Sequence, residues 1–202
     1  MTTAIKYKPY PKYKSSGTDW LGKIPDEWEI KRLKYVSAQS IKNGVGEAAE
    51  HIDESWPRYI RITDIESPRA LRADTFRSLS PEIAKDAPVQ YGDLLMAAVG
   101  ATFGHSYLHL KKSGRYCYAG YLVKFSPNKK VYPEFAGYWA ESVIYWNQLN
   151  ANVIQSTIQN FSAAKYKELL FVLPPLENQK SIADFLDREA AKIDEVVREN
   201  KS

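Results

Sequence analysis

The sequence predicts an α+β fold, in which a body with a mixed sheet of short strands precedes a long C-terminal coiled-coil helix. Residues 57–66 alternate polar and β-branched apolar side chains, which is typical of a strand with one buried face. Residues 133–151 instead carry apolar side chains at helical spacing. A third, uninterrupted helical pattern fills the end of the chain. We therefore divide the chain into a body, residues 1–174, and a helical arm, residues 175–202.

The first half of the body is expected to consist of an extended N-terminal segment, a turn and two strands. Residues 1–18 are rich in Lys, Tyr and Pro and show neither a helical nor a strand period, so they predict the extended N-terminal segment. Residues 19–28 are interpreted as a turn, and residues 28–39 as a strand leading into a short helix. A glycine-broken loop follows over residues 41–50. The alternating segment 57–66, with one slip in its period, predicts the next strand.

The second half of the body is expected to add strands around its helices. Residues 89–100 predict a turn and an apolar strand, and residues 106–110 and 114–127 predict further strands. Ser162 is a candidate N-cap for a short helix, because its hydroxyl can accept a hydrogen bond from a first-turn N–H. Residues 169–173, LLFVL, predict a last short strand before the arm.

The arm shows a heptad pattern, with seam positions at steps of three and four over about three heptads. The seam positions are Leu176, Gln179, Ala183, Leu186, Ala190, Ile193 and Val197. A second stripe of Ile182, Phe185 and Val196 makes the apolar face wider than a two-stranded coiled coil needs. Either the two stripes face the body and a partner, or the arm is a buried terminal helix. A helix of roughly 40 Å is hard to cover with a domain of this size, which favours a partner.

Charge is distributed unevenly along the 202-residue chain, whose formal net charge is +4. Residues 94–133 contain no Asp or Glu, and residues 94–167 hold eight basic and two acidic side chains. From residue 176 onward, seven acidic residues outnumber five basic ones. Such a field suits a polyanion beside the body, although a solvated basic face is the alternative interpretation.

Patterns that would indicate catalysis or a bound cofactor are weak. The glycines of residues 44–46 and 100–104 lack the lysine and hydroxyl of a phosphate-binding loop and are expected to form turns. His105 and His109 lack further ligands at the spacing of a zinc site. Cys117 has no obvious histidine partner for thiol catalysis. We therefore expect no catalytic residue, metal site or cofactor in this chain.

The sequence also predicts a cytoplasmic protein. No stretch approaches the ~20 apolar residues that span a bilayer, so no membrane partner is expected. The N-terminal lysines are not followed by the apolar run of a signal peptide. Cys117 is the single cysteine, so no internal disulfide can form.

Cations interleaved with aromatic rings are the most informative remaining feature. One group surrounds Gly114 and comprises Tyr107, Lys111, Lys112, Arg115, Tyr116 and Tyr118. An arginine-rich section comprises Arg58, Arg61, Arg69, Arg72 and Arg77. Lysine and arginine neutralise phosphates, and arginine can also read a guanine edge with two hydrogen bonds. Each residue alone could be an ordinary surface cation, but together they favour DNA binding.

Four segments together resemble the specificity (S) subunits of type I restriction-modification systems. They are residues 15–36, 59–65, 91–104 and 156–194, in the family's order. The last, which contains LPPLENQKSIADFLDREAAKID, is the most specific. The resemblance implies a target-recognition domain that reads one half of a bipartite DNA target, followed by a conserved helix. In the family, two such helices pair antiparallel as a spacer between two recognition domains.

The resemblance further implies the partners of this chain. Methyltransferase subunits would bind S-adenosylmethionine, and restriction subunits would hydrolyse ATP with Mg²⁺, while the specificity subunit has no catalytic activity. The sequence departs from the family pattern because it holds one recognition domain and one helix. We therefore expect a half-subunit or a fragment.

We assign roles to individual residues on these grounds. Predicted phosphate contacts are Lys111, Lys112, Arg115 and Lys165. Predicted base-reading residues are Arg61, Arg72, Arg77, Gln155 and Ser156. We also predict that two arms pair in an antiparallel homodimer, whose two-fold symmetry would suit inverted half-sites. The predicted contact residues of the arm are Leu176, Ala183, Leu186, Ala190, Ile193 and Val197. A nucleic-acid-modifying enzyme domain and a basic protein–protein adaptor remain the alternatives.

Overall fold

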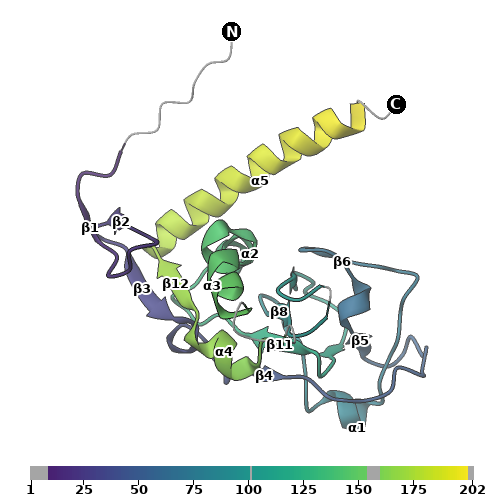
Figure 1. The fold of residues 1–202 in the computed structure, drawn as a ribbon. Helices are drawn as coiled ribbons and strands as arrows, with labels where there is room; N and C mark the ends of the chain where they lie inside the picture. Colours follow the sequence, from purple (N-terminus) through teal and green to yellow (C-terminus); the bar gives the residue numbers. More distant parts are fainter. Residues whose placement is uncertain (1–8, 101, 154–159, 200–202) are drawn as a thin grey trace.

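The computed structural model describes residues 9–100, 102–153 and 160–199. Its body contains short strands and helices, and one long helix leaves the body at the C-terminal end (Figure 1). The helix α5, Leu176–Glu199, is 24 residues long, or about 36 Å at 1.5 Å per residue. The predicted α+β fold with a long C-terminal helix is therefore confirmed.

A four-stranded antiparallel sheet forms the centre of the body. Its strand order is β4 (Lys42–Asn43), β11 (Leu122–Phe125), β8 (Leu94–Ala97) and β9 (Ser106–Leu108). Every residue of β8, β9 and β11 is buried. These strands read as apolar runs rather than alternations because both faces of the sheet are covered.

Four two-stranded pairs surround the central sheet. Strand β5 (Arg58–Ile60) runs parallel to β10 (Tyr116–Tyr118), and the other pairs are antiparallel. Those pairs are β1 (Tyr13–Ser15) with β2 (Lys23–Pro25), β3 (Glu29–Arg32) with β12 (Leu170–Leu173), and β6 (Ile65–Ser67) with β7 (Ala70–Leu71). The described strands therefore include both parallel and antiparallel pairs.

The predicted strand over residues 57–66 was wrong in its continuity. The chain forms β5, then the 3₁₀ turn η2 (Ile62–Asp64), and then β6. The carboxylate of the buried Asp64 accepts hydrogen bonds from the backbone N–H and the guanidinium of Arg61, which closes the turn. The slip in the alternation marks this turn. A second 3₁₀ turn, η1 (Leu33–Tyr35), follows β3 as the predicted short helix.

The single helix predicted over residues 133–151 is divided into α2 (Pro133–Glu141) and α3 (Val143–Val153). The backbone of Ser142 is extended at the break, and its hydroxyl donates to the carbonyl of Trp139 at 2.7 Å. This local bond competes with helix continuation, as serine side chains commonly do. Side chains of α2 and α3, including Phe135, Trp139 and Tyr145, belong to the largest buried cluster.

Two short helices complete the body. Helix α1 (Pro81–Ala84) follows the arginine-rich section, and helix α4 (Ala163–Glu168) precedes β12. The predicted N-cap is confirmed, since the hydroxyl of Ser162 accepts from the N–H of Lys165 at 3.4 Å. Helix α4 leads directly into the confirmed strand β12, and β12 leads into α5.

Helix α5 has a half that lies on the body and a half that projects from it (Figure 1). Gln179 and Ala183 are fully buried within the chain, whereas every residue from Ala190 to Glu199 is exposed. Ala183 was predicted to contact a partner helix, and this is corrected, because its side chain already packs inside its own chain. The division of the chain at residue 174 stays a prediction.

Candidate nucleic-acid interface

The loop between β9 and β10 presents three exposed cations to solvent. Lys111, Lys112 and Arg115 are all exposed, and they lie within one reversal of the chain. Gly114 makes this reversal possible, because its φ of +90° lies in the left-handed region that other residues rarely adopt. The loop thus concentrates positive charge at one projecting edge of the body.

Aromatic side chains anchor the base of this loop. The ring centroids of His109 and Tyr116 are 4.4 Å apart, and the hydroxyl of Tyr107 lies 3.2 Å from Nδ1 of His109. Burial lowers the pKa of His109 to about 4, even though nearby Asp93 opposes the shift, and Lys111 makes a smaller contribution in the same direction as burial. The imidazole is therefore neutral near pH 7. The positive charge of the loop comes from its exposed side chains alone.

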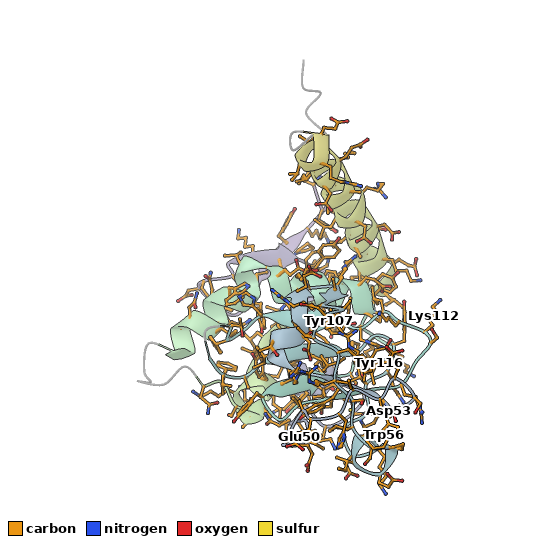
Figure 2. All side chains as sticks on the ribbon, turned by 90° about the vertical axis from the view of Figure 1, so that its right-hand side faces the viewer. Glu50, Asp53, Trp56, Tyr107, Lys112 and Tyr116 are labelled. Atoms are coloured by element: carbon orange, nitrogen blue, oxygen red, sulfur yellow. The ribbon has the colours of Figure 1, made fainter. Side chains whose placement is uncertain are left out.

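The three cations are held in different ways. The ammonium of Lys111 lies 6.0 Å from the ring centroid of Tyr116, and that of Lys112 lies 5.6 Å from the centroid of Tyr91. At such exposed sites a cation–π contact contributes about 0.5–1 kcal/mol, which orients a lysine without neutralising it. The guanidinium of Arg115 donates to the carbonyl of Ser55. Figure 2 shows Lys112 at the outer edge of the body.

Two shallow hollows flank the loop and share its residues Gly114, Arg115 and Tyr116. The first has a volume of about 480 Å³, and its other lining residues are Glu54, Ser55, Trp56, Arg58 and Phe76. The second has a volume of about 320 Å³ and is lined mainly by apolar side chains and Lys85. The first hollow combines hydrogen-bond donors, a carboxylate and aromatic rings. Such a mixture matches the donors and acceptors of base edges better than a uniform row of phosphates.

The arginine-rich section contains side chains that stabilise the fold. Arg61 forms an ion pair with the buried Asp64 at 2.6 Å and donates to the carbonyl of Thr75 at 2.8 Å. Arg77 donates to the carbonyls of Ala49 and Phe76. Since these guanidinium groups are bonded within the body, they support the loops of this region. Arg72 is exposed, and it is the predicted base-reading arginine whose side chain points to solvent.

The structure does not bring all the predicted DNA contacts to one place. Lys165 is exposed on α4, where it lines a different hollow together with Trp20 and Glu168. Gln155 and Ser156 lie outside the described residues. The predicted roles of these three residues stay predictions.

The body contains a buried ion pair that counting basic and acidic residues along the sequence did not reveal. Lys124 and Asp93 lie 3.3 Å apart, and each is less than 5% exposed. Lys124 also donates to the carbonyl of Pro88, and Asp93 accepts from the hydroxyl of Ser126. Lys124 was counted with the basic face, but it is buried and joins β11 to the start of β8. No sequence pattern distinguishes it from the exposed lysines around it.

The arm exposes apolar side chains at its first residue, Leu176, and along its projecting half. The exposed fractions of Ile193 and Val197 are 63% and 45%, while Leu186 is half-buried. Leu176 is 37% exposed at the start of the helix, and Ala190 is exposed. The heptad seam therefore faces the body in its first half and solvent in its second half.

The described residues also bear on metal binding and membrane insertion. Within residues 9–100, 102–153 and 160–199, no three His, Cys, Asp or Glu side chains gather closely enough to hold a metal ion. No helix in this described part of the chain is long and apolar enough to cross a membrane.

Comparison with known proteins decides the family. A family model described as the type I restriction modification DNA specificity domain matches residues 25–199. The chain belongs to this family. The chain is 24% identical over 182 residues to the Type I restriction enzyme EcoKI specificity subunit of Escherichia coli (strain K12). It is 20% identical over 178 residues to the StySPI specificity subunit of Salmonella potsdam. Each match covers 86% of this chain but only 38% of the relative's length.

Solved structures share the fold of this specificity domain. The HsdS subunit from Thermoanaerobacter tengcongensis superposes with a TM-score of 0.67 at 19% identity, over 87% of this chain and 45% of that subunit. A chain from a structure on complex assembly and conformational transition of the type I R-M system gives a TM-score of 0.67 at 17% identity, over 92% of this chain and 43% of that chain. The resemblance found in the sequence is thus confirmed at the level of family and fold.

Proposed function

We propose that this specificity domain reads one half of a bipartite DNA target on behalf of a type I restriction-modification complex. The observation that carries the proposal is the projecting loop with Lys111, Lys112 and Arg115, on a chain that belongs to a family of DNA specificity domains. The loop cations approach phosphates, and the adjoining hollow meets base edges. The described residues form one body, to which we assign one half of the target, and the chain spans 38% of the length of its curated relatives.

Roles within the interface follow from how each side chain is held. Lys111 and Lys112 are flexible point charges resting on rings, which suits phosphate positioning. Arg115 is fixed by Ser55 at the rim of the hollow, so it contacts phosphate at a defined place. Arg72 is the candidate for direct base reading. Arg61 and Arg77 act by holding the neighbouring loops.

The salt dependence of DNA affinity tests this interface. Each phosphate contact contributes about 0.9 to the slope of log affinity against log salt concentration. The double variant K111A/K112A should reduce the slope for duplex DNA by about 2. The matched control K180A/K192A removes two lysines from α5, and it should leave the slope unchanged. An unchanged slope in K111A/K112A would show that the loop does not contact phosphates.

We also propose that the projecting half of α5 pairs with a second helix, supplied either by another polypeptide segment or by a second copy of this chain. Exposed Ile193 and Val197 support this, because apolar side chains at heptad spacing are stabilised by a facing helix. An antiparallel homodimer would place recognition bodies at both ends. Methyltransferase and restriction subunits would join the complex thus formed.

Sedimentation of the chain at increasing concentration tests the homodimer. The variant Leu186→Asp should weaken association, but Leu186 is half-buried on its own body, so this change also disturbs the fold of the chain. Ile193→Asp changes an exposed side chain and therefore tests association alone. Ala191→Asp adds the same charge on the opposite face of the helix and should leave association unchanged. A parent chain that stays monomeric at high concentration refutes the homodimer.

We assign no catalytic step to this chain and expect it in the cytoplasm. S-adenosylmethionine would bind the methyltransferase subunits, and ATP with Mg²⁺ the restriction subunits. Mixing experiments with labelled S-adenosylmethionine test this division. Methyl transfer to target DNA should require the methyltransferase subunits, and transfer by this chain alone would favour the alternative of a nucleic-acid-modifying enzyme. A DNA competitor that fails to displace a protein partner from the basic loop would favour an adaptor.

A further inference from the structure

Besides the apolar packing of Ala183, polar side chains attach the first half of α5 to the body at two separate points. The first point is the buried side chain of Gln179, whose Oε1 accepts from the N–H of Tyr132 at 2.8 Å. Its Nε2 donates to the carbonyls of Lys130 at 2.9 Å and Pro174 at 2.8 Å. This amide ties the start of the helix to the segment before α2 and to the end of β12. Gln179 therefore fixes where the helix begins.

The second point lies two turns further along the helix, at Asp187. Its Oδ1 accepts from the hydroxyl of Tyr138 on α2 at 2.5 Å and from Nη1 of Arg69 at 2.6 Å. The guanidinium of Arg69 lies 4.6 Å from the ring centroid of Tyr138, so the three side chains contact one another in pairs. Burial, helped by the bond to Asp187, raises the pKa of Tyr138 to about 12. The hydroxyl thus remains a donor throughout the neutral range.

The body side of this cluster is itself well anchored. Arg69 lies in the turn between β6 and β7, and the carbonyl of the preceding Pro68 accepts from the N–H of Leu108 in the central sheet at 2.7 Å. Tyr138 lies on α2, which packs on β9 and on α5. The cluster therefore connects α5 to two different elements that are fixed to the central sheet. Because the body residues of this cluster are held rigidly, the contact with Asp187 can define the direction of α5.

Anchors at two distant points fix the direction of a rod, whereas anchors gathered near one end, at Gln179 and the buried Ala183, leave the rod more freedom to pivot. Gln179 and Asp187 are eight residues apart, or about 12 Å along the helix axis. The end of the described helix, Glu199, lies about 30 Å from Gln179. A slack of about 2 Å at Asp187 is therefore magnified to about 5 Å at Glu199, because the displacement scales with distance from the pivot. Beyond Asp187, the helix continues into its exposed half.

We propose that Arg69, Tyr138 and Asp187 form a latch that sets the direction of the arm relative to the recognition body. These are positioning residues, since they act on the DNA only through the direction of α5. Arg69, which the sequence grouped with DNA-contacting arginines, faces the arm instead. A second consequence rests on the proposed function: the latch sets the separation of two half-sites, because the arm holds two recognition bodies apart.

Electron–electron distance measurements test the latch directly. Spin labels on E82C in α1 and E195C in the projecting half of α5 report the direction of the arm, and both sites are exposed. Dilution with unlabelled chain restricts the signal to distances within one molecule, and the native Cys117 is buried. The parent chain should give one narrow distance distribution. The variants R69A and D187A should broaden it by about 4 Å, which is the slack of about 2 Å magnified twofold at residue 195, about 24 Å from Gln179 along the helix.

Matched variants separate the latch from a general effect of charge or stability. D194A removes the same side chain further along the arm and should keep the narrow distribution. R69K preserves the positive charge and should largely restore the narrow distribution that R69A loses. Distributions in R69A and D187A as narrow as in the parent would overturn the latch. Equal broadening in D194A would overturn it as well.

A DNA experiment then tests the consequence for half-site separation. Duplexes carrying two half-sites at increasing separation should give the parent chain a sharp optimum. R69A and D187A should tolerate separations about one or two base pairs either side, since a base pair advances the duplex by about 3.4 Å. Their affinity for a single half-site should match that of the parent. If the parent fails to bind DNA, the proposed function fails, while the spin-label distances still decide the latch.

Discussion

Replacing Gly44 by alanine should strongly destabilise the body, although the change adds only one methyl group. A Cβ at Gly44 would lie 2.0 Å from the carbonyl oxygen of Tyr118 and 2.7 Å from that of Ala119. Both obstacles are backbone atoms, so neither can rotate away as a side chain would. Gly44 is required here because two stretches of backbone approach each other closely, not because it forms a phosphate loop or a free turn.

The loss of stability in Gly44→Ala can be worked out from the backbone segments that would have to move apart. The backbone at this approach is joined by hydrogen bonds from the N–H of Val45 to the carbonyl of Tyr118, at 3.1 Å, and from the N–H of Gly120 to the carbonyl of Val45, at 2.7 Å. Relieving the clash costs about 1–3 kcal/mol as overpacking, and losing these two bonds adds about 1 kcal/mol each. We expect a loss of about 3 kcal/mol or more in the free energy of unfolding.

Urea unfolding and thermal unfolding provide the assay, and Gly46→Ala provides the matched control two residues away. A Cβ at Gly46 meets nothing within 4 Å, so this variant should stay within about 0.5 kcal/mol of the parent. For a chain of this size, 3 kcal/mol corresponds to a lowering of Tm by roughly 6–12 °C. Equal Tm values for Gly44→Ala and Gly46→Ala would refute the inferred backbone approach.

Three further predictions concern buried groups. Because burial lowers the pKa of His109 to about 4 while an unfolded histidine titrates near 6.5, the unfolded chain binds the proton first as the pH falls. The free energy of unfolding should therefore be lower at pH 5 than at pH 7, and His109 should contribute about 2 kcal/mol of this decrease. In urea unfolding of His109→Gln, the decrease between pH 7 and pH 5 should be smaller by that amount. Lys124→Met should cost about 3 kcal/mol in urea unfolding because it leaves the buried Asp93 without its counter-charge, whereas the exposed Lys129→Met should cost less than about 0.5 kcal/mol. Burial raises the pKa of Cys117 to about 12, so Ellman's reagent at pH 8 should label the thiol only after unfolding, and rapid labelling of the native chain would contradict its burial.

Local patterns in the sequence were sufficient for the long helix and several short elements. The apolar stripes of residues 176–199 and the hydroxyl of Ser162 act within their own segments, so their spacing predicted the helix and the cap correctly. The break at Ser142 was missed because its neighbours on both sides keep helical spacing. One serine that bonds to the preceding turn was enough to end the helix there.

The site was less predictable because its contacts are long-range. Lys124 and Arg69 look like ordinary cations in the sequence, but Lys124 is paired with Asp93 and Arg69 with Asp187, 118 residues away. Gln179 occupied a seam position, yet it serves as a hydrogen-bonding anchor inside its own chain. The exposed cations Lys111 and Lys112 were predicted from local pattern alone, since their turn is built around Gly114.

The pairing of β3 with β12 has a consequence for how recognition bodies can be exchanged. Strand β3 lies near the beginning of the body and β12 is the last strand described, and the two pair antiparallel with four residues of each strand opposite one another. The entry and exit of the body are therefore side by side, as in domains that tolerate insertion into another chain. A different body with the same two end strands could replace this one without moving the helix that follows. If the body reads DNA as proposed, one genetic exchange would change the specificity while the arm keeps its place.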